Sequence, residues 1–516
     1  MADPSVLIVG AGPTGLVLAL WLTKQGVPVR ILDETAEPGT TSRALAVHAR
    51  TLELYEQLDL AEPVVAGGYT VPGLRLWLGG REAARVPFEQ IASDLTPYGF
   101  LHIFPQDEHE RLLIERLQDA GVQVERSTEF LGYAEEGDHV SARLRRPGGG
   151  ESVVTAAFIA GCDGAKSKVR EIMGTGFPGG TYPQVFYVAD VVGEGLAMNG
   201  DLNVDLDDTD FLAIFPLAHE GRVRLIGAVK PAPGKDVDKL TFDDISDRAS
   251  HNLKLKVDKV NWFSVYRVHH RVTDRFRKGR AFVLGDAAHI HTPVGGQGMN
   301  TGIGDSINLA WKLEAVLAGR AQDALLDTYE AERRTFALRL VQTTDRLFNV
   351  AAAEGHLGEI IRTRVAPIVL PQMVRFEAAR DYIFRTISQI TLNYRGKGLD
   401  EGHAGPVHGG DRLPWVKMGD SDNYQALKRI GWQIHVYGKA DGYVKRWAEG
   451  RRIPLDVYAW TEGMRHAGLR ENALYLIRPD TYVALAEASG APEAIEVYFK
   501  DRGWDGFTQT VDSCAD

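Results

Sequence analysis

The first 33 residues alternate between short apolar runs and a glycine-rich turn. Ser5–Val9 is an apolar run rich in β-branched side chains, which predicts a strand buried on both faces. After the turn, apolar residues recur at helical spacing over Leu16–Gln25, and Gly26 ends this predicted helix. Val27–Leu32 is apolar again. The pattern therefore predicts a strand, a helix and a second strand in one βαβ unit.

Helical and strand patterns follow one another as far as residue 176. Helical spacing covers 50–58 and 108–120, and short strand patterns cover 123–127 and 153–160. From 177 to 266 the pattern changes, because strand-like runs alternate with turn residues and little helix. The clearest of these runs are Val185–Val192, Phe211–Phe215 and Arg222–Val229. This predicts an antiparallel sheet inserted into an α/β domain.

The α/β pattern returns after residue 266. Ala281–Leu284 is predicted to be a buried strand, and a glycine-rich loop follows it. Long helical patterns then cover Asp305–Leu317, Leu325–Asn349 and Val374–Ile390. The glycines of Gly396–Gly410 mark a domain boundary. Beyond it we predict strands at Gln433–Val436 and Leu455–Ala459. We also predict a hairpin formed by Leu474–Ile477 and Tyr482–Ala486, and a helix at Pro492–Asp501.

Composition and charge narrow the class of protein. Of the 516 residues, 44% are hydrophobic and 25% are charged, as in ordinary globular proteins. The net charge of −11 arises from acidic and basic residues mixed along the chain, which argues against nucleic-acid binding. With only Cys162 and Cys514 present, we expect no disulfide framework, and we expect the protein to be located in the reducing cytoplasm. Glycines interrupt the apolar stretch Val6–Leu22, so we expect neither a signal peptide nor a membrane helix there.

The turn of the βαβ unit reads Gly10-Ala11-Gly12-Pro13-Thr14-Gly15, a GxGxxG motif between a predicted strand and a predicted helix. Its three glycines allow a tight turn, the approach of a pyrophosphate, and packing of the helix on the strand. The N–H groups at the start of the helix can then bind phosphate. Asp33 ends the second strand, where a carboxylate accepts hydrogen bonds from ribose and repels a 2′-phosphate. The dinucleotide is therefore FAD or NAD rather than NADP.

A second glycine-rich segment, Ala281–Thr301, reads AFVLGDAAHIHTPVGGQGMNT. Three shorter segments accompany it, namely Ser42-Arg43-Ala44, Gln106 ahead of Glu110-Arg-Leu-Leu113, and Gly161-Cys-Asp-Gly-Ala-Lys-Ser-Lys-Val-Arg170. Together with the first turn, and in the same order over nearly the whole chain, they resemble the class A flavoprotein aromatic hydroxylases, the relatives of p-hydroxybenzoate hydroxylase. Gly409–Pro414 and Leu474–Asp480 are similar to the thioredoxin-like extension of the branch that acts on phenols and aromatic polyketides.

The resemblance implies an α/β fold with three parts. We expect a Rossmann-like FAD-binding domain over residues 1–176 and 267–394, an inserted antiparallel substrate-binding sheet over 177–266, and a C-terminal thioredoxin-like domain over 403–516. The C-terminal part contains no Cys-x-x-Cys, which excludes dithiol chemistry. We therefore interpret it as a packing or assembly domain, with which a homodimer is compatible.

The resemblance also assigns residues to the cofactor. Asp33, or the adjacent Glu34, is expected to bind ribose, and Asp286 to accept a hydrogen bond from a ribityl hydroxyl. Pro293 and Gly296 are expected to border the flavin atom that receives oxygen. The other FAD contacts that it implies are Gly10, Ala11, Gly12, Pro13, Thr14, Gly15, Arg43, Gln106, Asp163, Gly298, Met299 and Asn300. A helix that starts near Gly298 would direct its positive end at the negative charge of reduced flavin.

The activity implied by the resemblance is that of a FAD-dependent monooxygenase. NAD(P)H reduces the FAD, O2 then forms a C4a-hydroperoxyflavin, and this species hydroxylates a phenolic or polyketide-type aromatic compound. We assign no side chain as an acid or base, and we expect Tyr187, Phe215 and Pro216 to line the substrate pocket. His289 and His291 are interpreted as structural residues rather than metal ligands, because no cysteine lies near them.

The partners and two alternatives follow from the same motifs. The chain has no second strand–GxGxxG–helix unit, so NAD(P)H is expected to bind transiently as a co-substrate. We expect no nucleic-acid or membrane partner. Two alternatives stay open, because a fold does not fix a reaction. One is a Baeyer–Villiger-type oxygenation of a polyketide or quinone, and the other is a protein that binds flavin and an aromatic ligand without turnover.

Overall fold

The computed structural model of the protein describes residues 4–39, 44–88, 94–205, 212–218, 221–229, 236–245, 248–292, 294–351 and 377–504. A six-stranded sheet lies at the centre of its first part. Strand β1 (Val6–Val9) pairs in parallel with β2 (Val29–Leu32) and with β12 (Phe158–Gly161). Every residue of β1 is buried, as predicted for a strand covered on both faces, and every residue of β12 is buried as well. The strand order is β18-β19-β12-β1-β2-β8, completed by β18 at Arg277–Lys278, β19 at Ala281–Val283 and β8 at Val124–Glu125.

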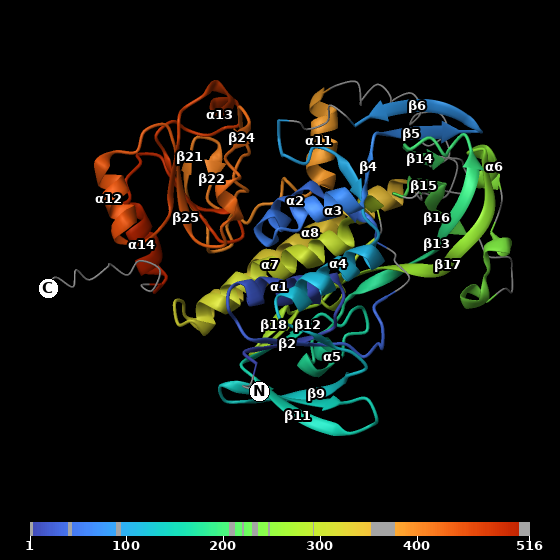
Figure 1. Ribbon diagram of the computed structural model, residues 1–516, viewed down its shortest axis with the longest axis horizontal. Helices are drawn as coiled ribbons and strands as arrows, with labels where there is room; N and C mark the ends of the chain where they lie inside the picture. Colours follow the sequence, from blue (N-terminus) through green and yellow to red (C-terminus); the bar gives the residue numbers. More distant parts are fainter. Residues whose placement is uncertain are drawn as a thin grey trace.

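Helix α1 (Pro13–Lys24) follows β1 directly and confirms the predicted strand–turn–helix unit. It packs between α4 (Gln106–Asp119) and the long helix α7 (Gln297–Leu317). Their apolar side chains join those of the sheet in the largest hydrophobic core of the described chain. Helices α1 and α7 therefore pack side by side (Figure 1).

Helix α7 begins eight residues before the predicted start at Asp305. Gly298, Gly302 and Gly304 interrupt the apolar pattern in this stretch, which is why the sequence pattern missed it. The helix needs small residues there, because α1 lies very close. A Cβ added to Gly302 would lie 2.3 Å from Thr14 Oγ1. Glycine at 302 is thus a requirement of helix packing.

An eight-stranded sheet forms the second layer of the molecule (Figure 1). Its order is β20-β17-β13-β16-β15-β14-β5-β6, in which only the pair of β14 with β5 is parallel. The strands are β20 (His289–Ile290), β17 (Leu255–Val272), β13 (Gly179–Gly195), β16 (Arg222–Val229), β15 (Leu212–Pro216), β14 (Leu202–Asp205), β5 (Gly73–Leu78) and β6 (Arg81–Pro87). For this sheet, the sequence predicted strands only within 177–266. The β5–β6 hairpin joins from a distant part of the chain, a non-local pairing that the local pattern did not reveal.

Two small sheets and several helices complete this part of the molecule. The predicted strand at 153–160 is in fact two strands, because β11 belongs to a separate antiparallel sheet and β12 to the central one. The small sheets are β9 (Glu129–Glu136), β10 (His139–Arg145) and β11 (Glu151–Ala156), and β3 (Ala46–Val47), β7 (Leu101–Ile103) and β4 (Tyr69–Val71). The helices are α2 (Ala49–Tyr55), α3 (Ala61–Gly67), α5 (Lys168–Met173), α6 (Arg248–Asn252), α8 (Asp327–Ala351) and α11 (Glu377–Ile387).

The C-terminal residues form a separate lobe, coloured orange to red in Figure 1. Strand β25 (Gln433–Tyr437), helix α12 (Gly442–Gly450) and the parallel strand β26 (Leu455–Tyr458) are followed by the antiparallel pair β27 (Leu474–Ile477) and β28 (Val483–Glu487) and by α14 (Glu493–Asp501). This βαβ–ββα order is that of a thioredoxin-like fold. The lobe also contains β21 (Glu401–Ala404), β22 (Val407–His408), β23 (Lys417–Met418), β24 (Ser421–Asp422) and α13 (Glu462–His466).

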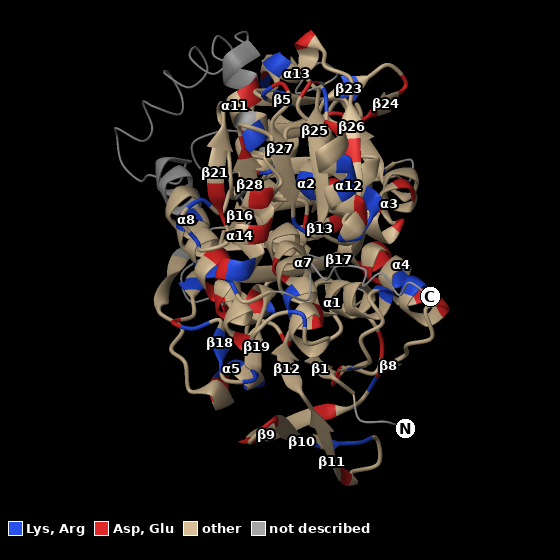
Figure 2. Ribbon diagram, turned by 90° about the vertical axis from the view of Figure 1, so that its left-hand side faces the viewer, with Lys and Arg blue, Asp and Glu red and all other residues tan. Residues whose placement is uncertain are grey.

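Basic and acidic residues are interspersed over the side of the molecule that faces the viewer in Figure 2. Within the described residues, every helix is too short or too polar to cross a membrane.

Candidate active site

The turn from β1 into α1 has the geometry of a phosphate cradle. Gly10 has a φ of +101°, and a Cβ at this position would lie 2.3 Å from the carbonyl oxygen of Cys162. Gly15 is equally constrained, since its Cβ would lie 2.0 Å from the carbonyl oxygen of Gly10. Gly12 differs, because no described atom lies within 4 Å of a Cβ added there, and no described side chain caps α1. The open space in front of free helix N–H groups fits a pyrophosphate.

Asp33 lies directly after β2 and beside this turn. Its Oδ2 accepts a hydrogen bond from the backbone N–H of Ala11 at 2.7 Å, and its Oδ1 accepts from Thr35 N and Thr35 Oγ1 at 2.9 and 2.6 Å. Glu34 is exposed. Of the two carboxylates proposed from the sequence, Asp33 is therefore the one tied to the glycine turn.

The segment after β19 brings Asp286 to the same region. Gly285 has a φ of +57°, and a Cβ there would lie 2.6 Å from Thr14 Oγ1 of α1. Gly285 and Ala287 are buried, whereas Asp286 between them is exposed. Since Thr14 also touches Gly302, the structure brings the α1 turn, the Asp286 turn and the first part of α7 together around one threonine. An exposed carboxylate beside the phosphate cradle fits the ribityl contact expected of Asp286.

The start of α7 is formed by two glycines in the left-handed region, Gly295 at φ +78° and Gly296 at φ +63°. No described side chain caps the helix, so its first N–H groups and the positive end of its dipole are available to an anionic ring. Met299 is buried, and a Cβ on Gly298 would meet the ring of His291 at 3.8 Å. This arrangement fits the pyrimidine end of a flavin.

Asn300, which the resemblance assigns to the FAD contacts, secures this loop through its side chain. Its Oδ1 accepts hydrogen bonds from His48 N and Thr51 Oγ1 at 2.9 and 2.7 Å. Its Nδ2 donates to the carbonyl oxygens of Ala46 and Gly296, both at 2.9 Å. The amide thus joins the loop of Gly295 and Gly296, called the glycine loop below, to β3 and α2.

His48 is a site residue that the sequence analysis missed. It is buried, and its Nε2 lies 2.9 Å from the carbonyl oxygen of Gly295. Burial lowers the pKa of His48 to about 4, and burial lowers the pKa of His291 to about 4 as well. Both rings are therefore neutral at pH 7. The only feature of the sequence that could have indicated His48 as a site residue was its position in the mainly apolar segment 44–49.

The Asp-Gly motif after β12 organises helix α5. Asp163 Oδ2 accepts hydrogen bonds from the N–H groups of Lys168 and Val169 at 2.7 and 3.1 Å, and burial raises the pKa of this carboxyl. Arg170 of the same helix donates to the carbonyl oxygen of Ala287 at 2.7 Å, which connects the motif to the Asp286 turn. Cys162 is a buried free thiol.

The remaining predicted cofactor residues are placed less fully. Gln106 begins α4, where its N–H donates to the carbonyl oxygen of Ala44 at 3.1 Å and its Nε2 donates to Glu110 at 2.8 Å. Arg43 and Pro293 lie outside the described residues.

The predicted substrate residues divide between the two faces of the eight-stranded sheet. Phe215 packs in an apolar cluster with Ala46 and Ile226, on the face towards the glycine loop. Tyr187 packs on the opposite face beside Phe263. Pro216 follows Phe215 in the strand and pairs with a residue of the Tyr187 cluster, so it also faces away. Phe215 therefore lies on the face of the glycine loop, and Tyr187 and Pro216 lie on the other face of the sheet.

His289 has a structural partner. Its Nε2 lies 2.7 Å from Asp305 Oδ2, and both side chains are buried. Among the residues that the structure describes, no group of three or more His, Cys, Asp or Glu side chains is arranged to hold a metal ion.

A mainly parallel sheet with a glycine-rich turn, joined to a mainly antiparallel sheet, is the architecture expected from the sequence for a FAD-binding flavoprotein. The chain belongs to the FAD binding domain family, whose sequence profile matches residues 3–344. Its cofactor is accordingly FAD.

Individual relatives cover most of the chain. It is 38% identical over 409 residues to 6-methylpretetramide 4-monooxygenase of Streptomyces rimosus, covering 77% of this chain and 70% of that protein. It is 35% identical over 526 residues to 12-dehydrotetracycline 5-monooxygenase/anhydrotetracycline 6-monooxygenase of the same species, covering 96% and 98%. The solved structure of anhydrotetracycline hydroxylase from S. rimosus matches with a TM-score of 0.77 and 27% identity, covering 98% and 100%. The protein is a flavin-dependent aromatic monooxygenase.

Proposed function

We propose that the protein hydroxylates a phenolic or polyketide-type aromatic compound, with NAD(P)H as reductant and dioxygen as oxidant. The observation that carries the proposal is the junction between the glycine loop and the apolar cluster of the sheet. A Cβ on Gly296 would lie 2.9 Å from the side chain of Ala46, and Ala46 belongs to the cluster of Phe215 and Ile226. An aromatic compound on this face would lie beside the loop that fits the flavin ring. The tetracycline-type compounds named for two relatives suit such a face.

The residues of this junction have two tasks. The apolar cluster excludes water from the reacting groups, which protects reactive intermediates from side reactions with water. It consists of Leu45, Ala46, Val71, Ile103 and Leu217, with the partly buried Tyr69, Phe88, Leu101, Leu202, Phe215 and Ile226 around them. The start of α7 stabilises negative charge next to Gly296 through its dipole and free N–H groups. FAD, when bound, supplies hydride acceptance and oxygen activation.

The reductant has no dedicated domain in this proposal. The sequence contains a single strand–GxGxxG–helix unit, and FAD uses it. NAD(P)H therefore binds transiently, and the bound aromatic compound controls the reduction step by favouring a reducible arrangement of the site.

The direct test is a panel of phenols and aromatic polyketides scored for NAD(P)H oxidation and for product mass. We expect one class to stimulate oxidation and to yield a product that is heavier by one oxygen atom. Anaerobic mixing with NADH and with NADPH is the companion measurement. A flavin that stays oxidised with every compound and both nucleotides would indicate a binding protein without turnover and would contradict the proposal.

Two phenylalanines on opposite faces of the sheet test the position of the substrate. Phe215→Ala removes an aromatic wall from the proposed pocket, so we expect KM for the aromatic compound to rise about 10-fold, as for the loss of a buried aromatic contact. Phe263→Ala is the matched control, because Phe263 is also half-buried but lies on the Tyr187 face. A rise in KM for Phe263→Ala instead would place the substrate on the other face.

A further inference from the structure

A buried carboxylate on α7 contacts the turn that carries Asp286. Asp305 is fully buried, and its Oδ2 accepts hydrogen bonds from the N–H of Gly285 at 3.0 Å and from His289 Nε2 at 2.7 Å. Its Oδ1 accepts from Arg333 Nε of α8 at 2.6 Å. One carboxylate thus joins the Gly285–Ala287 turn, strand β20 and two helices.

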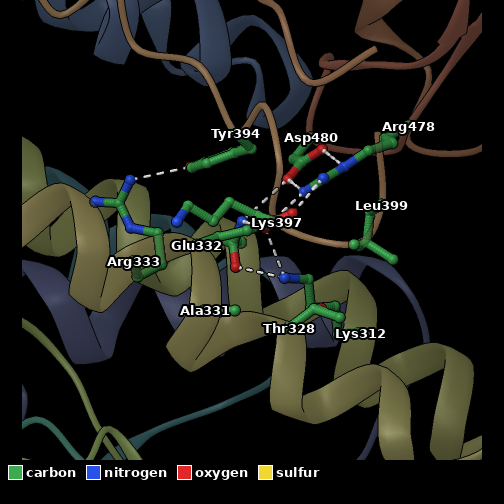
Figure 3. Close-up of polar contacts among 12 residues, drawn as sticks. Lys312, Thr328, Ala331, Glu332, Arg333, Tyr394, Lys397, Leu399, Arg478 and Asp480 are labelled. Carbon is green, nitrogen blue, oxygen red and sulfur yellow. Dashed lines mark hydrogen bonds and ion pairs between the residues drawn. The ribbon is translucent and has the colours of Figure 1, made fainter. Parts of the chain in front are cut away.

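Arg333 completes this buried group. It is 1% exposed, its Nη2 donates to the carbonyl oxygen of Thr301 at 3.0 Å, and its Nη1 donates to Tyr394 Oη at 3.0 Å. Figure 3 shows the contact with Tyr394. Each charge of the Asp305–Arg333 pair therefore has three partners, which is the condition under which a buried ion pair is tolerated. The guanidinium also holds the second turn of α7 through Thr301.

The geometry limits the freedom of the Asp286 turn. Gly285 lies between Thr14 Oγ1 on one side and the Asp305 carboxylate on the other. Asp286 is the next residue and is exposed. The direction in which Asp286 leaves the protein core is therefore set by the hydrogen bond from Gly285 N to Asp305. The same carboxylate belongs to the helix whose first residues fit the flavin ring.

We propose that Asp305, with Arg333 as its counter-ion, is a positioning residue for FAD: it orients Asp286 towards the ribityl chain and holds α7 in register with that contact. The inference rests on the proposed role of Asp286. Asp305 itself does not touch the cofactor. Its function requires a carboxylate, because an amide has one acceptor oxygen and one donor NH2 and cannot accept hydrogen bonds from Gly285, His289 and Arg333 together.

The test is a double-mutant cycle on FAD affinity, measured by quenching of FAD fluorescence on titration of the apo-protein. We expect Asp286→Ala to raise Kd about 10- to 100-fold and Asp305→Asn to raise it about 10-fold, as for loss of hydrogen bonds to a charged group. In the Asp286→Ala background, Asp305→Asn should change Kd by less than about 3-fold, because its effect passes through Asp286. Fully additive effects would overturn the inference.

The controls separate positioning from general destabilisation. Asp201→Asn alters another buried carboxylate that accepts from two arginines, Arg75 and Arg85, but lies directly before strand β14 of the eight-stranded sheet. We expect it to leave the FAD Kd unchanged, and an equal loss of affinity in this variant would overturn the inference. Arg333→Lys is the milder variant if Asp305→Asn does not fold, and a normal Kd in it would also count against the proposal.

The outcomes distinguish this inference from the proposed function. If Asp286→Ala binds FAD like the unmodified protein, the assignment of Asp286 fails and the positioning role fails with it. If Asp286→Ala weakens binding but Asp305→Asn does not, only the positioning role is wrong. Weakening by both, without additivity, supports both.

Discussion

Arg478 is the side chain whose loss should most disturb the joint between the C-terminal lobe and the FAD-binding part (Figure 3). It lies at the end of β27, where Nη1 and Nη2 donate to Glu332 of α8 at 2.6 and 3.0 Å, and Nε and Nη2 donate to Asp480 at 2.9 and 2.6 Å. Lys312 Nζ of α7 donates to Glu332 at 2.8 Å. All four side chains are at most 2% exposed, so two positive and two negative charges are buried together.

Arg478→Met keeps an unbranched side chain and removes the charge that both carboxylates share. Glu332 would then rely on Lys312 and Asn308, and the buried cluster would carry one negative charge in excess. Removal of one partner from a buried ion pair costs about 3–5 kcal/mol of unfolding free energy. Because Arg478 forms four of the hydrogen bonds in the cluster, we expect a loss near the upper end of this range. Adding Asp480→Asn restores neutrality and should recover about 2 kcal/mol.

Urea unfolding followed by tryptophan fluorescence is a suitable assay, because the rings of Trp311 and Trp432 meet across the joint with centroids 5.8 Å apart. Arg465→Met is the matched control, since its ion pair with Glu462 is two-thirds exposed and should contribute less than about 1 kcal/mol. The reasoning would be refuted if Arg478→Met were no less stable than Arg465→Met, or if Asp480→Asn lowered the stability of Arg478→Met further.

Three further predictions concern the cofactor, pH and reduction. The purified protein should be yellow and should release FAD on denaturation; release of FMN would contradict the assignment. Burial alone would raise the pKa of Glu332, but Arg478 and Lys312 outweigh it and lower the pKa to about 2. A carboxyl group whose pKa is lowered by folding stabilises the fold at pH values above its ordinary pKa, and this contribution is lost as the pH falls towards the lowered pKa. The urea midpoint should therefore drop between pH 4.5 and about 2, and it should drop less steeply in Glu332→Gln. Stopped-flow reduction by NAD(P)H should be up to about 100-fold faster with a true substrate, and equal rates would refute control by substrate.

The dinucleotide turn could be predicted because its constraints are local. Gly15 is needed at a contact with Gly10 inside one strand–turn–helix unit, although the contact that requires Gly10 is with Cys162 after β12. The opposite orientation of two predicted substrate residues could also be derived from the sequence. Phe215 and Pro216 are neighbours in a strand, and neighbours in a strand point to opposite faces. Phe215 and Pro216 therefore lie on opposite faces of the sheet.

The buried charges could not be predicted from the pattern. Glu332 and Arg333 stand in the segment Ala331-Glu-Arg-Arg-Thr335, which reads as a solvated helix surface. They are buried because Arg478 approaches from 146 residues further along the chain and Asp305 from 28 residues before. A local hydrophobic pattern contains no record of such partners. Sixteen of the 21 residues of α7 are buried for the same reason, since strands, helices and the C-terminal lobe surround it.

The C-terminal lobe was interpreted from the sequence as a packing or assembly domain. Its contacts indicate that it also supports the helix that forms part of the proposed FAD site. Asp480 and Tyr482 share a buried cavity of about 10 Å³ with Asn300, the residue that secures the glycine loop. The lobe also covers Lys312 near the other end of α7. Its removal would expose apolar side chains and leave paired charges without partners along the helix whose first turn we propose to face the flavin. The packing of the lobe and the position of the glycine loop therefore both depend on helix α7, and neither part can be treated as an independent module.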